Sequence, residues 1–150
     1  MHNINDNSTL EVLAQAYEAT TYRVKVPEGD ILIRIGVPNP ELDLLLNQYG
    51  VFSWAFITAW NPASVALSVS QNQQRYAEMI AYLHRRNVPY LDGIGVGDDT
   101  DWPPEQSVLT FGLNREEARE LGALFGQNAV VYGECNGFPK LLWCLPNKQK

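Results

Sequence analysis

The order of the predicted strands and helices after residue 52 constrains the fold of this chain more than any other feature. Between residues 52 and 135, the hydrophobic patterns predict a strand, a helix, two strands, a helix and a strand. This is the split βαβ pattern of ferredoxin-like folds, which places two helices on one face of an antiparallel sheet. We therefore predict an α+β fold with a mainly antiparallel sheet and a ferredoxin-like split βαβ core at about residues 52–135.

The residues before this core predict an N-terminal helix, a hairpin and a second helix, and a final strand follows the core. Four residue pairs are typical of helix N-termini: Ser8 with Glu11, Asn39 with Pro40, Ser70 with Gln73, and Asn114 with Glu117. Gly50 and Gly126 are expected to end the second and fourth helices. Together these elements suit a single domain over residues 1–150, a length that can bury a sizeable core.

The segment from Phe52 to Pro62 predicts a buried central strand that ends in a polar, aromatic corner. Its first half is apolar and aromatic, as is typical of a strand covered on both faces. Pro62 lacks a backbone donor and favours an extended conformation for Asn61. The split βαβ order places strands 107–113 and 129–135 on the two sides of this strand, both antiparallel to it.

Three segments that are distant in the sequence should then meet at one edge of the sheet, namely residues 58–62, 102–107 and 126–128. The start of the third helix lies on the same side, where its free N–H groups could bind an anion. We expect a binding rim that supplies amides, hydroxyls, one carboxylate and two indoles: Thr58, Trp60, Asn61, Asn72, Trp102, Glu105, Ser107, Gln127 and Asn128. Indoles stack on flat ligands and amides orient them, so the rim favours a small polar ligand of nucleotide or sugar type.

Most of these residues also have a structural interpretation. Glu105 follows two prolines and could be desolvated for acid–base catalysis, but a carboxylate that fastens its loop by accepting N–H bonds is favoured. Asn61 is expected to cap the turn before Pro62. Trp60 and Trp102 could simply cover the core, as large aromatic side chains often do.

Two further positions have similar alternatives. Gln127 and Asn128 follow the predicted end of a helix, where turn chemistry accounts for both residue types. Arg34, on the hairpin beside the core, could anchor an anion at the rim, and a salt bridge to one of the many acidic residues is the favoured alternative.

The same segments carry a family resemblance. They include Ile33-Arg34-Ile35-Gly36, residues 56–62, Asn72, residues 102–107, Phe111-Gly112-Leu113 and residues 126–132. On these motifs the chain resembles a bacterial domain-of-unknown-function family, number 3293, from about Tyr17 to the last strand. The family has no assigned activity, so the resemblance implies none. Its motif residues are largely the predicted rim residues, and they do not include Cys135 or Cys144.

Charge and hydropathy exclude several classes of function. The net charge of -6 repels phosphate backbones, so we expect no nucleic-acid partner. No apolar run approaches the roughly 20 residues that span a bilayer, so we expect no membrane insertion. Because residues 1–8 are polar rather than signal-like, we expect a cytoplasmic protein.

The sequence predicts no metal and no cofactor. Asp98, Asp99 and Asp101 could hold a divalent cation, but their spacing departs from the calcium-loop pattern, and a solvated loop is expected. His2 and His84 lie in no motif with a serine or cysteine, so no nucleophilic triad is predicted.

The two cysteines should be free thiols. Asn136-Gly137 predicts a tight turn, with Cys135 opposite Phe138 and Cys144 near Ala129. In that arrangement the two sulfur atoms lie strands apart and cannot form a disulfide.

Three functions fit these observations. The first is a binding domain for a small polar ligand at the rim. The second is an enzyme that uses Glu105 as general acid or base, with Asn61 and Gln127 as polarising groups. The third is a protein-interaction module, in which the sheet edge or exposed tryptophans bind a second copy of the chain or another protein.

Overall fold

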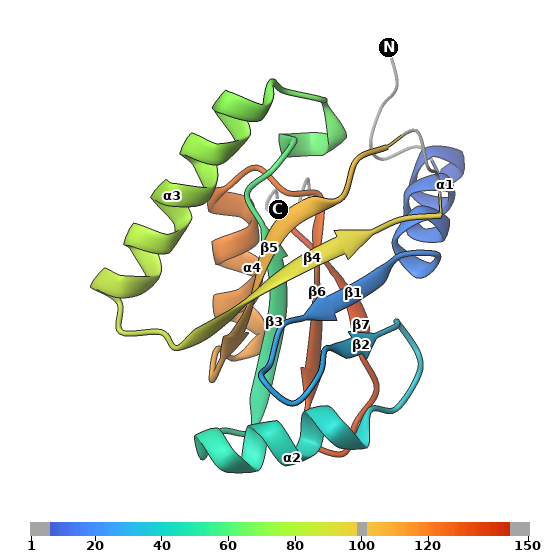
Figure 1. Ribbon diagram of the computed structural model, residues 1–150. Coiled ribbons are helices and arrows are strands. Elements are labelled where there is room, and N and C mark those ends of the chain that lie inside the picture. Colours follow the sequence, from blue (N-terminus) through green and yellow to red (C-terminus); the bar gives the residue numbers. More distant parts are fainter. Residues whose placement is uncertain (1–6, 99–101, 145–150) are drawn as a thin grey trace.

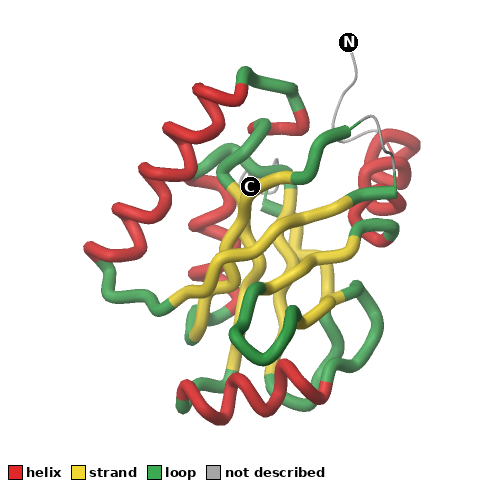
Figure 2. Tube along the Cα trace, in the orientation of Figure 1, coloured by secondary structure: helices red, strands yellow, loops and turns green. Residues whose placement is uncertain are grey.

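A seven-stranded antiparallel sheet is the centre of the molecule (Figure 1, Figure 2). The computed structural model describes residues 7–98 and 102–144. The elements in chain order are α1 (Asn7–Glu18), β1 (Thr21–Val24), β2 (Ile31–Ile33), α2 (Pro40–Tyr49), β3 (Ser53–Thr58), the 3-10 turn η1 (Pro62–Ser64), α3 (Val69–Arg85), β4 (Tyr90–Val96), β5 (Glu105–Phe111), α4 (Arg115–Leu124), β6 (Ala129–Glu134) and β7 (Lys140–Trp143).

The strand order is β2-β1-β4-β5-β3-β6-β7, and every neighbouring pair is antiparallel. β3 lies between β5 and β6, with Trp54 opposite both Phe111 and Gly133. The predicted α+β class and the predicted neighbours of the central strand are therefore confirmed. The order β4-β5-β3-β6 is the one that the predicted split βαβ core requires.

The helices divide between the two faces of the sheet, as Figure 1 shows. On one face, Met79 and Leu83 of α3 and Leu121 of α4 pack on Ala55 and Ile57 of β3. On the other face, Leu42 and Leu46 of α2 belong to a second hydrophobic cluster. The strands contribute their alternate residues to it, including Trp54, Phe56, Leu109 and Val131. The side chains of β3 alternate between the two faces, and both are covered, so the strand reads as an almost continuous apolar run.

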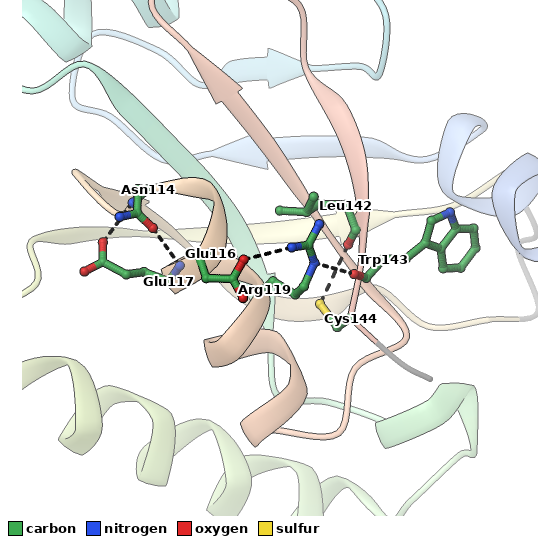
Figure 3. Close-up of polar contacts among 7 residues, drawn as sticks. All are labelled: Asn114, Glu116, Glu117, Arg119, Leu142, Trp143 and Cys144. Carbon is green, nitrogen blue, oxygen red and sulfur yellow. Dashed lines mark hydrogen bonds and ion pairs between the residues drawn. The ribbon is translucent and has the colours of Figure 1, made fainter. Parts of the chain in front are cut away.

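The caps confirm the predicted start and end of α2 and the predicted start of α4. The C-cap of α4 is Phe125, and the expected Gly126 follows it with a φ of 72°. The Asn39 side chain accepts a bond from Leu42 N at the start of α2, and Gly50 ends α2 with a φ of 70°. Asn114 and Glu117 form the predicted capping box of α4 (Figure 3). α1 is longer than expected, because it already includes Asn7.

The predicted start of α3 is wrong by two residues. Ser68, not Ser70, is the N-cap, and it forms a capping box with Gln71 rather than Gln73. Both serines have a glutamine three positions later, so the sequence pattern alone could not separate them. The structure favours the earlier one because Leu67 N is already bound by the side chain of Asn61.

The hairpin of β6 and β7 differs from its prediction by one residue of register. Ala129 faces Trp143, and Cys144 N donates to Asn128 O, whereas we expected Cys144 beside Ala129. Asn136 lies in the connection with a φ of 70°, and residues 135–139 separate the two strands, so the connection is longer than the expected two-residue turn. Both cysteines are free, as predicted.

Arg119 fastens α4 to β7 (Figure 3). Its Nε donates to Trp143 O at 3.1 Å, and its Nη1 forms an ion pair with Glu116 at 3.1 Å. The indole of Trp143 points away from α4 and meets the ring of Tyr17 in α1 edge-on, with 6.3 Å between the centroids. The last described strand thus contacts helices on both faces of the sheet.

Candidate functional site

A cavity of about 470 Å³ lies between α1 and the sheet. Leu13, Ala16 and Tyr17 of α1 form one wall. The other side is formed by β1, β3, β4, β5 and β6, with Tyr22 and Phe56 among the apolar residues. The Tyr22 and Phe56 rings meet edge-on with 5.2 Å between their centroids. The walls are therefore apolar and aromatic, which is typical of small-molecule sites.

The three segments that were predicted to meet do so beside this cavity. β3 and β5 pair with Thr58 opposite Ser107, and Ala63 N of η1 donates to Gly126 O at 2.7 Å. Six residues of the predicted rim line the cavity: Thr58, Asn61, Trp102, Glu105, Ser107 and Gln127. That these residues bind a ligand stays a prediction.

Glu105 connects the polar side chains of the site by accepting two hydrogen bonds. Its Oε2 accepts a bond from Asn61 Nδ2 at 2.8 Å and another from Trp102 Nε1 at 3.0 Å. Its Oε1 has no hydrogen-bond partner in the part of the chain that the structure describes. One carboxylate oxygen of this cavity-lining residue is thus held by two side chains, and the other accepts from no donor among the described residues.

Asn61 fixes the turn that follows β3. Its N–H donates to Asn72 Oδ1 at 2.8 Å, while its Oδ1 accepts from Asn72 Nδ2 at 2.9 Å and from Leu67 N at 2.9 Å. The predicted extended conformation is wrong, because Asn61 is left-handed with φ 47° and ψ 65°. Asparagine adopts this conformation more readily than most residues, and three side-chain partners hold it here.

Backbone strain is concentrated in the same turn. Asn61, Ala63 and Ser64 all have positive φ values, of 47°, 54° and 63°. Each such residue costs about 1–3 kcal/mol unless its surroundings impose the conformation. Gly126 packs against this turn so closely that an added Cβ would lie 2.9 Å from Pro62 Cβ. Strain of this kind is common at binding and catalytic sites, which supports a functional role for this corner.

Donors from the opposite side complete the corner. Gln127 Nε2 donates to Trp60 O at 3.1 Å and to Phe125 O at 3.3 Å. Arg75 of α3 donates from Nε to Ala59 O at 2.7 Å, and its guanidinium also binds Phe125 O. These bonds satisfy the carbonyl groups where β3 and α4 end, so the amide and guanidinium donors act inside the protein.

Four predicted rim residues do not line the cavity. Asn72 is buried behind Asn61, and Asn128 Nδ2 donates to Ser64 Oγ at 3.1 Å. Arg34 Nη1 donates to Ala19 O and to Thr21 Oγ1, both at 3.2 Å, at the side of α1. Trp60 lines a separate hollow of about 380 Å³ with Asp92 and other residues.

The two indoles therefore do not enclose one ligand as expected. Only Trp102 lines the main cavity. Trp60 Nε1 is buried and has no hydrogen-bond partner among the residues described. The sequence placed both side chains near one edge of the sheet, but Trp60 follows the end of β3 and Trp102 precedes β5, and the two indoles line different hollows there.

The start of α3 is not an anion site in this cavity. Among its N-terminal N–H groups, Gln71 N donates to Ser68 Oγ, and Asn72 N makes the first bond within the helix, to Ser68 O. No residue of α3 lines the cavity within the described chain. The expectation that the start of α3 binds an anion stays a prediction, and it does not concern this cavity.

Several lining residues were not predicted as site residues. Tyr22 is buried and Tyr17 is half-buried. Desolvation raises the pKa of both phenols, and the negative charge of Glu105 raises these pKa values further. The helical spacing of Leu13 and Tyr17 signals an inward face of α1, but only the curvature of the sheet leaves space beneath that face. Asp98 also lines the cavity, although its loop was expected to be merely solvated.

The structure gives no sign of a metal centre or a membrane-spanning helix in residues 7–98 and 102–144. No group of three or more metal-ligating side chains occurs there. No helix there is long and apolar enough to cross a bilayer. Asp99 and Asp101 of the predicted loop lie outside the described residues.

Comparison with known proteins gives one match. Residues 57–130 match the model of a family described as Protein of unknown function (DUF3293). This segment runs from β3 to the second residue of β6 and contains Asn61, Glu105 and Gln127. The predicted resemblance to this family is thus confirmed, over a shorter span than the one expected from Tyr17 onward. No curated protein and no solved structure matches the chain.

Proposed function

We propose that this chain, which matches a family of unknown function over residues 57–130, binds a small ligand in the cavity under α1. The main support for this proposal is the cavity, where apolar walls lie beside polar side chains from three segments that are distant in the sequence. Its volume of about 470 Å³ falls in the range of about 300–1,000 Å³ that is usual for small-molecule sites.

Glu105 is the anchoring group in this proposal. Asn61 and Trp102 hold its Oε2, so the carboxylate is already oriented before a ligand arrives. Preorganisation of this kind lowers the entropic cost of binding. The same bonds provide a structural role for Glu105, although the donors are side chains rather than the backbone N–H groups that we expected.

Catalysis by Glu105 is the second candidate. The free Oε1 favours it, because a general acid or base must reach the substrate directly. The expected polarising groups do not favour catalysis, because the Nε2 of Gln127 and the Nδ2 of Asn61 already donate to oxygen atoms of the protein. Binding therefore has broader support than catalysis.

A thermal-shift screen with nucleotides, sugars, amino acids and amines tests the proposal. A ligand at 100 times its Kd adds about 2.7 kcal/mol of stability. For a domain of this size, that corresponds to a rise in Tm of about 5–10 °C.

A blocked cavity provides the matched control. Gly95 lines the cavity, and a Cβ added there would meet its neighbours only at 3.9 Å and 4.0 Å. The Cβ of Gly95→Val is therefore accommodated, and its two γ-methyl groups extend into the cavity, so the variant should lose the ligand-induced shift. Its Tm without ligand measures the cost of the added methyl groups to folding. Ala81→Leu adds a side chain at an exposed position of α3 and should keep the shift. An unchanged shift in Gly95→Val would show that the ligand binds elsewhere, and a stable dimer with no shift across the screen would favour the protein-interaction module.

A further inference from the structure

The charges that line the cavity all have one sign. Glu105 and Asp98 are acidic, and no lysine, arginine or histidine is among the described lining residues. Arg34 lies nearby, but its bonds to Ala19 O and Thr21 Oγ1 hold it at the side of α1, outside the lining. A negative cavity attracts cations and repels phosphates or carboxylates.

Most hydrogen-bond donors of the described lining already donate to acceptors of the protein. Gln127 Nε2 makes two bonds to carbonyl groups, and Asn61 and Trp102 both donate to Glu105. Four of the six hydroxyl groups in the described lining donate to backbone carbonyls in the same way: Thr20 to Ala16, Tyr22 to Tyr17, Thr58 to Gln106, and Ser107 to Glu105. The hydroxyl groups of Tyr17 and Ser64 donate to no group among the described residues. A ligand that needs many donors from the protein would find few here.

Acceptors, in contrast, remain open. Glu105 Oε1, Gln127 Oε1 and the Asp98 carboxylate have no hydrogen-bond partner within residues 7–98 and 102–144. Gln127 is only 5% exposed, and it lines the cavity with an Oε1 that accepts from no donor among the described residues. The cavity thus offers acceptors to a ligand that carries N–H or O–H groups.

The walls add a second preference. Tyr17, Tyr22, Phe56 and Trp102 line the cavity, and aromatic faces attract organic cations through their π electrons. Aromatic and aliphatic walls also favour an apolar ligand body, because burying such a body removes it from water. Acidic acceptors and aromatic walls together fit a compound with a cationic head and an apolar body.

We propose that the ligand of this cavity is an organic cation, a protonated amine or guanidinium attached to an apolar body. Its N–H groups donate to Glu105 Oε1 and Gln127 Oε1, and its body packs against the aromatic walls. This inference rests on the proposed function and narrows it. Cation recognition replaces the nucleotide type of ligand, whose phosphates would require cations or free helix N–H groups in the lining.

Matched series of compounds test the class of ligand. Each series keeps one apolar body and changes only the head group, for example 2-phenylethylamine, phenethylguanidine, 2-phenylethanol and phenylacetate. Isothermal titration calorimetry and NMR chemical shifts measure the affinity of each compound for the full chain. We expect the two cations to bind at least about tenfold more tightly than the alcohol, because a hydrogen bond to a charged group is worth about 1.5–3 kcal/mol. The carboxylate should bind most weakly.

Glu105→Gln isolates the charge. The remaining amide oxygen can still accept from Asn61 and Trp102, while the new NH₂ group replaces the free acceptor. Cation affinity should fall about tenfold or more, and affinity for the alcohol should change less than about threefold. Glu120→Gln removes the same charge from an exposed position on α4 and should leave both affinities unchanged.

Each outcome has a definite meaning. Tighter binding of the alcohol or the carboxylate, or equal cation affinity in wild type and Glu105→Gln, overturns the cationic class. If those neutral or anionic compounds lose binding in Gly95→Val, the proposed function still stands. If no compound in the series or in the wider screen binds, the proposed function itself fails.

Discussion

Substitution of Asn72 by leucine should destabilise the protein by about 2–4 kcal/mol. Leucine has a similar branched shape but lacks the Oδ1 and Nδ2 atoms through which Asn72 bonds Asn61, so the Asn61 N–H is left buried without an acceptor. A buried, unsatisfied donor costs about 1–3 kcal/mol, and the lost side-chain hydrogen bond adds about 0.5–1.5 kcal/mol. Asn61 Oδ1 retains Leu67 N, which limits the loss to this range.

Urea denaturation of the wild type and Asn72→Leu, followed by tryptophan fluorescence, measures this difference. Gln74→Ala, at an exposed position of the same helix, is the control and should change the free energy of unfolding by less than about 0.5 kcal/mol. If Asn72→Leu is as mild as this control, the Asn61 turn does not depend on α3, and our account of the cavity mouth is wrong.

Two further predictions concern the core. Gly133→Ala should destabilise the protein by about 1–3 kcal/mol in thermal unfolding, because its Cβ would lie 2.6 Å from ring atoms of the buried Trp54, and a cost below about 0.5 kcal/mol would contradict this packing. Burial raises the pKa of the Cys144 thiol from 9.0 to about 12, so the folded state keeps the proton that the unfolded state releases. The stability that the buried thiol contributes is complete below pH 9 and is lost progressively between pH 9 and 12. We therefore expect the unfolding free energies of the wild type and Cys144→Ala to converge as the pH rises from about 8 to 11. Parallel curves would refute this cause.

The arrangement of the strands was the most predictable part of the fold. Helical and strand periodicities are local signals, and the order from β3 to β6 restricts the possible sheet to few topologies. Register and turn geometry were less predictable. The left-handed Asn61 is held by Asn72 and Glu105, and Asn136 N in the turn between β6 and β7 donates to Asp43 Oδ1, so both turns have partners outside their own segments.

The edge of the sheet where the candidate site lies was predictable from the sequence, but the set of residues that line the cavity was not. Antiparallel pairing brings the end of β3 to the start of β5, so Thr58 and Ser107 had to be close. The side of the sheet that each loop residue faces depends on the turn that follows the strand, and the strained turn at Asn61 directs Trp60 into another hollow. The wall from α1 was missed because no local pattern tells how far a helix stands from its sheet.

The bonds from Asn61 and Trp102 to Glu105 have a consequence for any mutational survey of this protein. The groups that would recognise a ligand also hold the chain where it leaves the central strand. An alanine scan would therefore report loss of folding and loss of recognition at the same positions, and would assign both to one cause. Only substitutions that change the charge but preserve shape and hydrogen bonding can separate the role of these residues in folding from their role in ligand recognition.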